Sequence, residues 1–146
     1  MTPTMSAADD AYEVAQRSAE RMWAADAASR DLGMTLEEVR PGYARMTMRV
    51  QERMIQGHGT GHGGYVFTLA DSTFAFACNS YGAPTVAAHC DISFLLPVAA
   101  GDVLIAEALE RTRYGRNGIY DVTVRRGDDI VAEFRGRSRT VGPPSP

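Results

Sequence analysis

Hydrophobic and polar residues alternate with a period of two along several segments of the chain. In residues 43–50, YARMTMRV, apolar residues occupy every second position from the alanine onward, with arginine or threonine between them. The same alternation is clear in residues 130–141, IVAEFRGRSRTV. Further apolar runs cover residues 85–96, 103–112 and 118–126. Because successive side chains of a strand point to opposite faces, these runs predict at least five strands of an antiparallel sheet.

Two other segments have a helical pattern. Residues 8–30 mix alanine with charged residues around the larger apolar anchors Met22 and Trp23, which predicts an amphipathic helix on the outside of the domain. Residues 63–80 are apolar around the whole helical wheel, with Asp71 as the one charged side chain, so this helix is predicted to be buried. The expected fold class is α+β: a sheet of five to six antiparallel strands wrapped around a long central helix, with an extra N-terminal helix.

Length and composition place limits on the kind of protein. A chain of 146 residues corresponds to a single domain over residues 1–146, with frayed tails expected at 1–7 and at the proline-rich 143–146. A net charge of -3 provides no basic surface for nucleic acid, and no stretch reaches the length of a membrane span. The N-terminus carries aspartates where a signal peptide has a basic region, so the expected location is cytoplasmic.

Asp71 is the residue of the central helix that most needs an explanation. A carboxylate in an apolar site costs free energy unless it is paired, hydrogen-bonded or functional. Its neighbours along the helix include Gly64, Thr68 and Ala75, whose small side chains leave room for another molecule to approach. The residues alone leave two interpretations open: a buried acid bonded to backbone groups or to an arginine of the sheet, or a functional carboxylate.

The glycine-rich segment GHGTGHGG, residues 57–64, directly precedes this helix. If the helix begins near Gly63, its free N–H groups and positive dipole end can bind a developing negative charge. With no side chains at Gly63 and Gly64, a substrate carbonyl can reach these donors, as an oxyanion hole requires. Gly63 and Asp71 are separated by ~12 Å along a helix, whereas a catalytic group must lie ~3 Å from its target. The spacing therefore favours a dimer in which Asp71 of one subunit faces the Gly63 end of the other.

Four segments together resemble a known family. HGTGHGGYVFTLADSTFAFACNS is followed by HCDISFLLPVAAGDVLIAEA, GIYDVTV and VAEFRGRSRTVG. Over about residues 26–142 these segments closely resemble the hotdog-fold acyl-CoA thioesterases of the PaaI type, which are associated with bacterial phenylacetate degradation. The resemblance implies a hotdog fold in dimers that pair into tetramers. It also implies hydrolysis of a coenzyme A thioester without a cofactor, with phenylacetyl-CoA and its ring-hydroxylated relatives as substrates.

The resemblance further implies roles for individual residues. Asp71 matches the catalytic carboxylate, which either activates water or attacks the thioester to give an anhydride. Gly63 matches the oxyanion-hole amide, and His62 shapes the loop before it. Gln56 falls near the thioester, where relatives often have Asn or Gln. Gly61 stands where relatives more often carry a larger residue, which leaves the rigidity of the loop open.

The phosphates of coenzyme A need cations, and arginines of the late strands are the candidates. By the resemblance, the residues implied in binding the nucleotide end are Arg113, Arg116, Arg137 and Arg139. The alternative is that alternating arginines form the solvated face of edge strands.

Other residues have simpler interpretations. His58 and His62 have the i, i+4 spacing of a helical metal pair, but the glycines between them argue against a helix and no third ligand is evident, so no metal is predicted. Cys78 and Cys90 fit neither a CxxC pair nor a disulfide framework, and we expect reduced core residues. Two other functions stay open: a hotdog hydratase or dehydratase with His62 and Asp71 as an acid–base pair, and a non-catalytic acyl-CoA-binding module.

Overall fold

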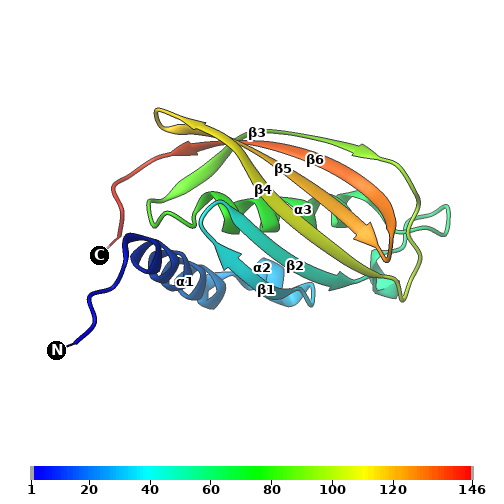
Figure 1. The fold of residues 1–146 in the computed structure, drawn as a ribbon. Coiled ribbons are helices and arrows are strands. Elements are labelled where there is room, and N and C mark those ends of the chain that lie inside the picture. The colour runs from blue at the N-terminus through cyan, green and yellow to red at the C-terminus, as the bar shows by residue number, and fades with distance from the viewer. Residues whose placement is uncertain (1, 146) are drawn as a thin grey trace.

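A six-stranded antiparallel sheet curves around one long central helix, as Figure 1 shows. The structure is a computed structural model that describes residues 2–145, so Met1 and Pro146, at the outer ends of the two expected tails, lie outside the described residues. The strand order across the sheet is β1-β2-β4-β5-β6-β3. The elements in chain order are α1 (Ala7–Ala25), α2 (Ala27–Asp31), β1 (Thr35–Arg40), β2 (Tyr43–Arg49), the 3-10 turn η1 (Glu52–Met54), α3 (Gly63–Cys78), β3 (Thr85–Phe94), β4 (Val103–Tyr114), β5 (Asn117–Arg126) and β6 (Asp129–Thr140).

The inner face of the sheet and α3 form the hydrophobic core. In β2 the buried residues are Ala44, Met46 and Met48, and in β6 they include Ala132 and Phe134, so the predicted alternation is confirmed. The apolar residues of α3 pack against β2, β4 and β5. This α+β arrangement is the predicted hotdog fold. No helix among residues 2–145 combines the length and the apolar composition needed to cross a bilayer.

The central helix begins at Gly63 as predicted but ends at Cys78, two residues before the predicted end at Ser80. Asn79 provides the physical reason. Its side-chain amide donates to the carbonyls of Ala75 and Thr85 at 2.9 Å each, and its Oδ1 accepts from the Thr85 N–H at 2.9 Å. The helix is therefore closed by a side chain that also fixes the start of β3.

The N-terminal region differs more from the prediction. The single helix predicted over residues 8–30 is two helices, because Asp26 ends α1 and caps α2 by accepting from the Ser29 N–H at 2.9 Å. The first helix starts at Ala7, inside the expected tail, since Ser6 and Asp9 form a capping box. At the other end of the chain, the Ser145 N–H donates to the Gly82 carbonyl at 3.1 Å.

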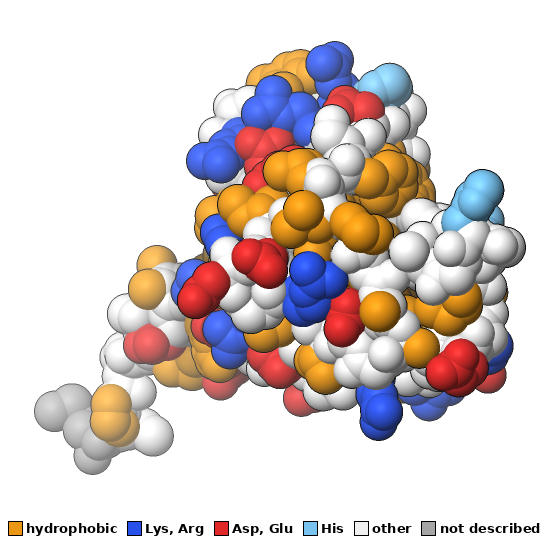
Figure 2. All heavy atoms as spheres, turned by 90° about the vertical axis from the view of Figure 1, so that its right-hand side faces the viewer, with side chains coloured by type: hydrophobic (Ala, Val, Ile, Leu, Met, Phe, Trp, Pro, Cys, Tyr) orange, Lys and Arg blue, Asp and Glu red, His pale blue; other side chains and the backbone are white. Residues whose placement is uncertain are grey.

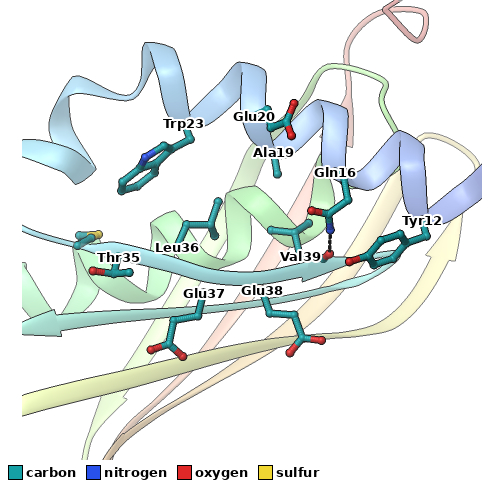
Figure 3. A pocket seen from close by; sticks show the side chains of 11 residues that line it. Tyr12, Gln16, Ala19, Glu20, Trp23, Thr35, Leu36, Glu37, Glu38 and Val39 are labelled. Atoms are coloured by element: carbon teal, nitrogen blue, oxygen red, sulfur yellow. Dashed lines mark hydrogen bonds between the residues drawn. The ribbon is translucent and has the colours of Figure 1, made fainter.

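Strand β1 had no separate segment in the sequence prediction, which allowed only for a sixth strand. Its sequence, TLEEVR, places two glutamates in succession, and the register with β2 shifts between Leu36 and Glu38. This bulge breaks the period of two. Helix α1 lies along β1, and the Gln16 side chain donates to the Val39 carbonyl at 2.6 Å (Figure 3).

Candidate functional site

The N-terminus of α3 presents a free backbone donor. His62 caps the helix, with its Nδ1 accepting from the Gly64 N–H at 2.8 Å. The Gly63 N–H, by contrast, has no acceptor among residues 2–145. The cap thus leaves the Gly63 amide available at the positive end of the helix dipole, where it can stabilise an oxyanion.

The loop before α3 is held by backbone bonds and close packing. The Gly61 N–H donates to the Val98 carbonyl and the His62 N–H to the Met54 carbonyl, both at 2.7 Å. A Cβ at Gly61 would overlap Cγ2 of Val98, which is buried. Glycine at this position therefore allows the loop to lie directly on the β3–β4 connection, and the loop is fixed despite its glycine content.

Gln56 is committed to the same loop. Its Nε2 donates to Thr60 Oγ1 at 2.7 Å, and its Oε1 accepts from the His58 N–H at 2.5 Å. The main chain closes the same turn, since the Gln56 N–H donates to the Thr60 carbonyl at 2.9 Å. Both ends of the carboxamide therefore shape the turn that leads to the helix.

Asp71 lies half-buried on α3, and its carboxylate has no hydrogen-bonding or ionic partner among residues 2–145. Burial raises the pKa of this carboxyl above its ordinary value. The first interpretation from sequence, an acid bonded to backbone or to an arginine, finds no such partner in the described chain. An unpaired, partly desolvated carboxylate is what a general base or a nucleophile requires.

Two free thiols lie near this carboxylate. Cys78 is buried on the same side of α3, and Cys90 is half-buried on β3. Burial and then the Asp71 charge raise the pKa of Cys90 to about 11, while burial is also the main cause of a pKa of about 12 at Cys78. Both thiols are therefore protonated and unreactive at neutral pH.

Strand β3 forms an edge of the sheet and carries much exposed apolar surface. It pairs only with β6, so its other edge has no strand partner within residues 2–145. Its large exposed apolar side chains, with those that follow it, are Val86, Phe94, Leu95 and Leu96, which are 42–55% exposed. Figure 2 shows apolar side chains gathered on the end of the molecule where α3 begins and β3 ends. An unpaired, apolar strand edge is a surface suited to a second chain.

The free end of α3 lies directly beside this apolar surface. A Cβ at Gly63 would lie 3.0 Å from the tip of the Phe94 ring, and an apolar recess is lined by Gly61, Gly63, Val66 and residues 94–98. Asp71 is eight residues further along the same helix, ~12 Å at 1.5 Å per residue. One chain therefore does not bring the two groups together.

The four candidate arginines fall into two groups. Arg113 and Arg116 line one recess together with Tyr81, near the turn between β4 and β5. There the Arg113 guanidinium lies 3.5 Å from the centre of the Tyr81 ring, and its Nε forms an ion pair with the Glu110 carboxylate at 3.0 Å. Arg137 and Arg139 lie instead on β6 and are exposed on the outer face of the sheet.

A cluster around Glu110 carried no signal in the hydrophobic pattern. The Glu110 carboxylate accepts from the Tyr81 and Tyr120 hydroxyls at 2.9 and 3.0 Å, and Tyr120 is fully buried. Glu110 lies at a bulge of β4, where the register with β5 shifts, so alternation does not show which way it points. The only cue was its position near the end of the strand predicted at residues 103–112, shortly before the turn that contains Tyr114.

A separate recess lies between α1 and β1 (Figure 3) and contains none of the predicted site residues. Its lining combines apolar Trp23 and Leu36 with Tyr12 and Gln16, and the Gln16 amide already bonds to backbone. Across residues 2–145 there is also no group of three or more His, Cys, Asp or Glu side chains placed to hold a metal ion. The reactive groups are therefore those on and before α3.

Comparisons with known proteins give one consistent answer. The model of the thioesterase superfamily matches residues 58–133. Acyl-coenzyme A thioesterase PaaI of Escherichia coli K12 is 42% identical over 129 residues, which cover 88% of this chain and 92% of the relative. Human acyl-coenzyme A thioesterase 13 is 31% identical over 106 residues, covering 70% of this chain and 76% of the relative.

Solved structures agree. The E. coli PaaI protein from the phenylacetic acid degradation operon superposes with a TM-score of 0.88 at 40% identity, covering 91% of this chain and 97% of that one. A point mutant of the phenylacetic acid degradation protein PaaI from Thermus thermophilus has a TM-score of 0.77 at 34% identity, covering 80% of this chain and 100% of that one.

Proposed function

The chain belongs to the thioesterase superfamily and, within it, to the PaaI-type acyl-CoA thioesterases, and we propose that it hydrolyses phenylacetyl-CoA or a ring-hydroxylated phenylacetyl-CoA to the free acid and CoA. One observation carries the chemistry: a single helix holds an amide N–H without an acceptor at Gly63 and an unpaired carboxylate at Asp71, as far as residues 2–145 are concerned. The E. coli relative, which comes from a phenylacetic acid degradation operon, supports the choice of acyl group. The reaction takes place in the cytoplasm and uses no cofactor besides the CoA of the substrate.

The active site is shared between two subunits in this proposal. Two copies of α3 packed antiparallel place Asp71 of one chain opposite Gly63 of the other, and a two-fold axis generates two equal sites. The unpaired edge of β3, with the exposed Phe94 beside Gly63, supports an interface at this position. Two such dimers pair into a tetramer.

The Gly63 N–H and the Asp71 carboxylate each have one role in the proposed hydrolysis. The thioester oxygen accepts from the Gly63 N–H, which stabilises the negative charge as the carbonyl carbon is attacked. Asp71 of the partner subunit either takes a proton from the attacking water or attacks the carbon itself to give an anhydride, which water then cleaves. In both routes the C–S bond breaks, and the CoA thiolate leaves and takes up a proton.

Residues beyond these two bind and shape the substrate. Gly64, without a side chain, keeps the helix N-terminus open, and the turn held by Gln56 lies just before it. The recess with Arg113 and Arg116 presents two guanidinium groups to the CoA phosphates. Arg137 and Arg139 add positive charge on the outer face of β6.

The hydratase alternative is weakened by the position of His62. Its Nδ1 accepts from the Gly64 N–H, so the ring serves as the helix cap, and no ion pair joins His62 to Asp71 within residues 2–145. An acid–base pair would require the two side chains to face one substrate together.

The test is thiol release from phenylacetyl-CoA, hydroxyphenylacetyl-CoA and a straight-chain acyl-CoA by wild type and by Asp71→Asn. Wild type is expected to release thiol fastest from an aromatic thioester. The variant, which keeps the shape of the side chain, should lose on the order of 10³-fold in kcat. Near-normal turnover by Asp71→Asn would sink the proposal. Binding without thiol release by wild type would indicate the non-catalytic module instead.

A further inference from the structure

The N-terminal helices contact one stripe of the central helix. The stripe consists of Ser72, Phe76 and Asn79, which are spaced i, i+4 and i+7 and so lie on one side of α3. Each of its members meets a residue of α1 or α2. Ser29 Oγ lies 2.8 Å from Ser72 Oγ, the Trp23 and Phe76 ring centres are 6.2 Å apart, and Ser18 Oγ donates to the Asn79 carbonyl at 2.7 Å.

This docking stripe is adjacent to the face that carries the reactive carboxylate. Asp71, Ala75 and Cys78 each precede a member of the stripe by one residue, about 100° around the helix at 3.6 residues per turn. The sheet covers the sides of α3 that carry residues such as Leu69 and Phe74, which are fully buried. Helices α1 and α2 therefore cover the flank of α3 directly beside Asp71.

Ser29 is held firmly enough to act as a support. Its N–H donates to Asp26 Oδ1 at 2.9 Å and its carbonyl accepts from the Met34 N–H at 3.1 Å. The residue is 1% exposed, so water cannot replace its contact with Ser72. All of its polar groups are thus engaged, and its hydroxyl has a fixed position against α3.

Asp71 has no such support of its own. Its carboxylate makes no bond within the described chain, so its position depends on the rotation and translation of α3 at that point. The contact closest to it in sequence from the N-terminal helices is the Ser29–Ser72 pair. A misplacement of about 1 Å in a catalytic group costs on the order of 10²-fold in rate.

We propose that Ser29 is a positioning residue for Asp71, acting through the Ser29–Ser72 hydroxyl pair, so that α1 and α2 are part of the catalytic machinery and more than an outer cover. The proposal rests on the function proposed above. Ser29 does not touch the substrate. It fixes the segment of α3 from which Asp71 reaches the thioester.

The structure offers a matched pair of variants. Ser29→Ala and Ser18→Ala each remove one buried hydroxyl that joins the N-terminal helices to α3, but Ser18 contacts Asn79, two turns beyond Asp71. We expect Ser29→Ala to lower kcat about five- to tenfold with KM unchanged, in line with the loss of one hydrogen bond. The two variants should lower the melting temperature to a similar extent, whereas Ser18→Ala should leave kcat within about twofold of wild type.

Ser72→Ala provides a second variant if Ser29→Ala folds poorly. Because the two hydroxyls act on one bond, the double variant Ser29→Ala/Ser72→Ala should have the same kcat as either single variant. Equal kcat in Ser29→Ala, Ser72→Ala and Ser18→Ala would overturn the proposal. Additive losses in the double variant would also overturn it, since the two residues would then act separately.

A titration of the Asp71 carboxyl by NMR separates this proposal from the proposed function, because it does not depend on turnover. Asp71→Asn identifies the resonance, and the nearby thiols of Cys78 and Cys90 titrate far above it. We expect the pKa of Asp71 to fall toward its ordinary value in Ser29→Ala and to stay unchanged in Ser18→Ala. A lowered pKa in Ser29→Ala together with no thiol release by wild type would reject the proposed function and show only that Ser29 sets the environment of Asp71. An unchanged titration in Ser29→Ala would reject the positioning.

Discussion

The polar groups on the outer face of the sheet and those on the exposed side of α3 differ in their bonding. On the sheet, Asp121 accepts from Arg135 at 2.7 and 2.9 Å and from Arg111 at 2.7 Å, and the hydrogen bond from Arg135 is the main cause of its lowered pKa. On α3, Asp71 has no partner within residues 2–145, and burial raises its pKa. Two aspartates of one chain are therefore shifted in opposite directions.

The same contrast extends to other groups of the two regions. Outer-face side chains bond to each other across strands, as Tyr43 does with Glu107. At the start of α3, the Gly63 N–H has no acceptor in the described part of the chain, although the bonds around it are complete. Polar groups that serve stability are thus paired, and those left unpaired at partly buried positions mark the candidate site.

Apart from the loss of Asp71 itself, the largest change in kcat is expected when the free N–H donor at Gly63 is removed. Gly63 is the first residue of α3, where proline is tolerated, so Gly63→Pro removes the N–H and keeps the helix start. We expect kcat to fall by about 10²–10³-fold, the usual cost of one oxyanion-hole donor. Assays of thiol release and the melting temperature measure the effects on activity and on stability separately.

Gly63→Ala is the control for that variant. Its Cβ meets the same Phe94 ring, an exposed and movable side chain, but the N–H remains. A loss of activity as large in Gly63→Ala as in Gly63→Pro would assign the effect to crowding, and the unpaired donor would lose its significance.

A second prediction concerns the loop that presents this donor. Gly61→Ala places a Cβ against buried Val98, and such overpacking should cost about 1–3 kcal/mol in the free energy of unfolding. Gly57→Ala, in the same loop, meets no atom within 4 Å and should change stability by less than about 0.5 kcal/mol. Urea denaturation of both variants measures the difference, and equal stabilities would show that the loop is not held by packing.

The smallest expected effects are on stability, and they test the opposite pKa shifts of Asp71 and Asp121. Because the folded-state pKa of Asp71 lies above the ordinary 3.8, its contribution to stability falls as pH rises from about 3.8 through that raised pKa. Because the pKa of Asp121 lies below 3.8, its contribution is present above 3.8 and is lost as pH falls through the lowered pKa. At pH 7, Asp71→Asn should therefore raise the melting temperature.

Asp121→Asn should do the reverse at pH 7, lowering stability by about 1 kcal/mol or less, as expected for exposed ion pairs. It should leave kcat unchanged, whereas Asp71→Asn removes activity. Melting temperatures of wild type and both variants between pH 3 and pH 8 test the signs. A destabilising Asp71→Asn would mean that its carboxylate is stabilised in the folded protein, contrary to the burial that raises its pKa.

Regular patterns of apolar residues in the sequence correctly predicted the strands and the helix in which they occur. Alternation located β2 and β6, and uniform apolarity located α3. The predicted end of α3 and the predicted single N-terminal helix were wrong, because each is decided by the hydrogen bonds of one side chain. The bonds of Asn79 and Asp26 depend on local geometry that periodicity does not contain. Strand β1 was not predicted as a separate segment because its bulge interrupts the period of two.

The candidate site was predicted in the same uneven way. Asp71 and Gly63 could be found because a lone charge in an apolar helix and glycines before it are visible in sequence. The contact of Ser29 with Ser72 could not, since two serines 43 positions apart carry no pattern. The division of the arginines between the Tyr81 recess and the outer face likewise required the fold.

The position of Gly63 and Asp71 on one helix has a consequence for inheritance. Nine consecutive codons, 63 to 71, encode both halves of a site that, in the proposed dimer, is assembled from two translated copies. Lesions at the two positions are then complementary: a chain defective at Gly63 still provides a carboxylate, and one defective at Asp71 still provides a donor. A mixed pair of two inactive chains holds one intact site, so two null alleles in one cell restore part of what each has lost.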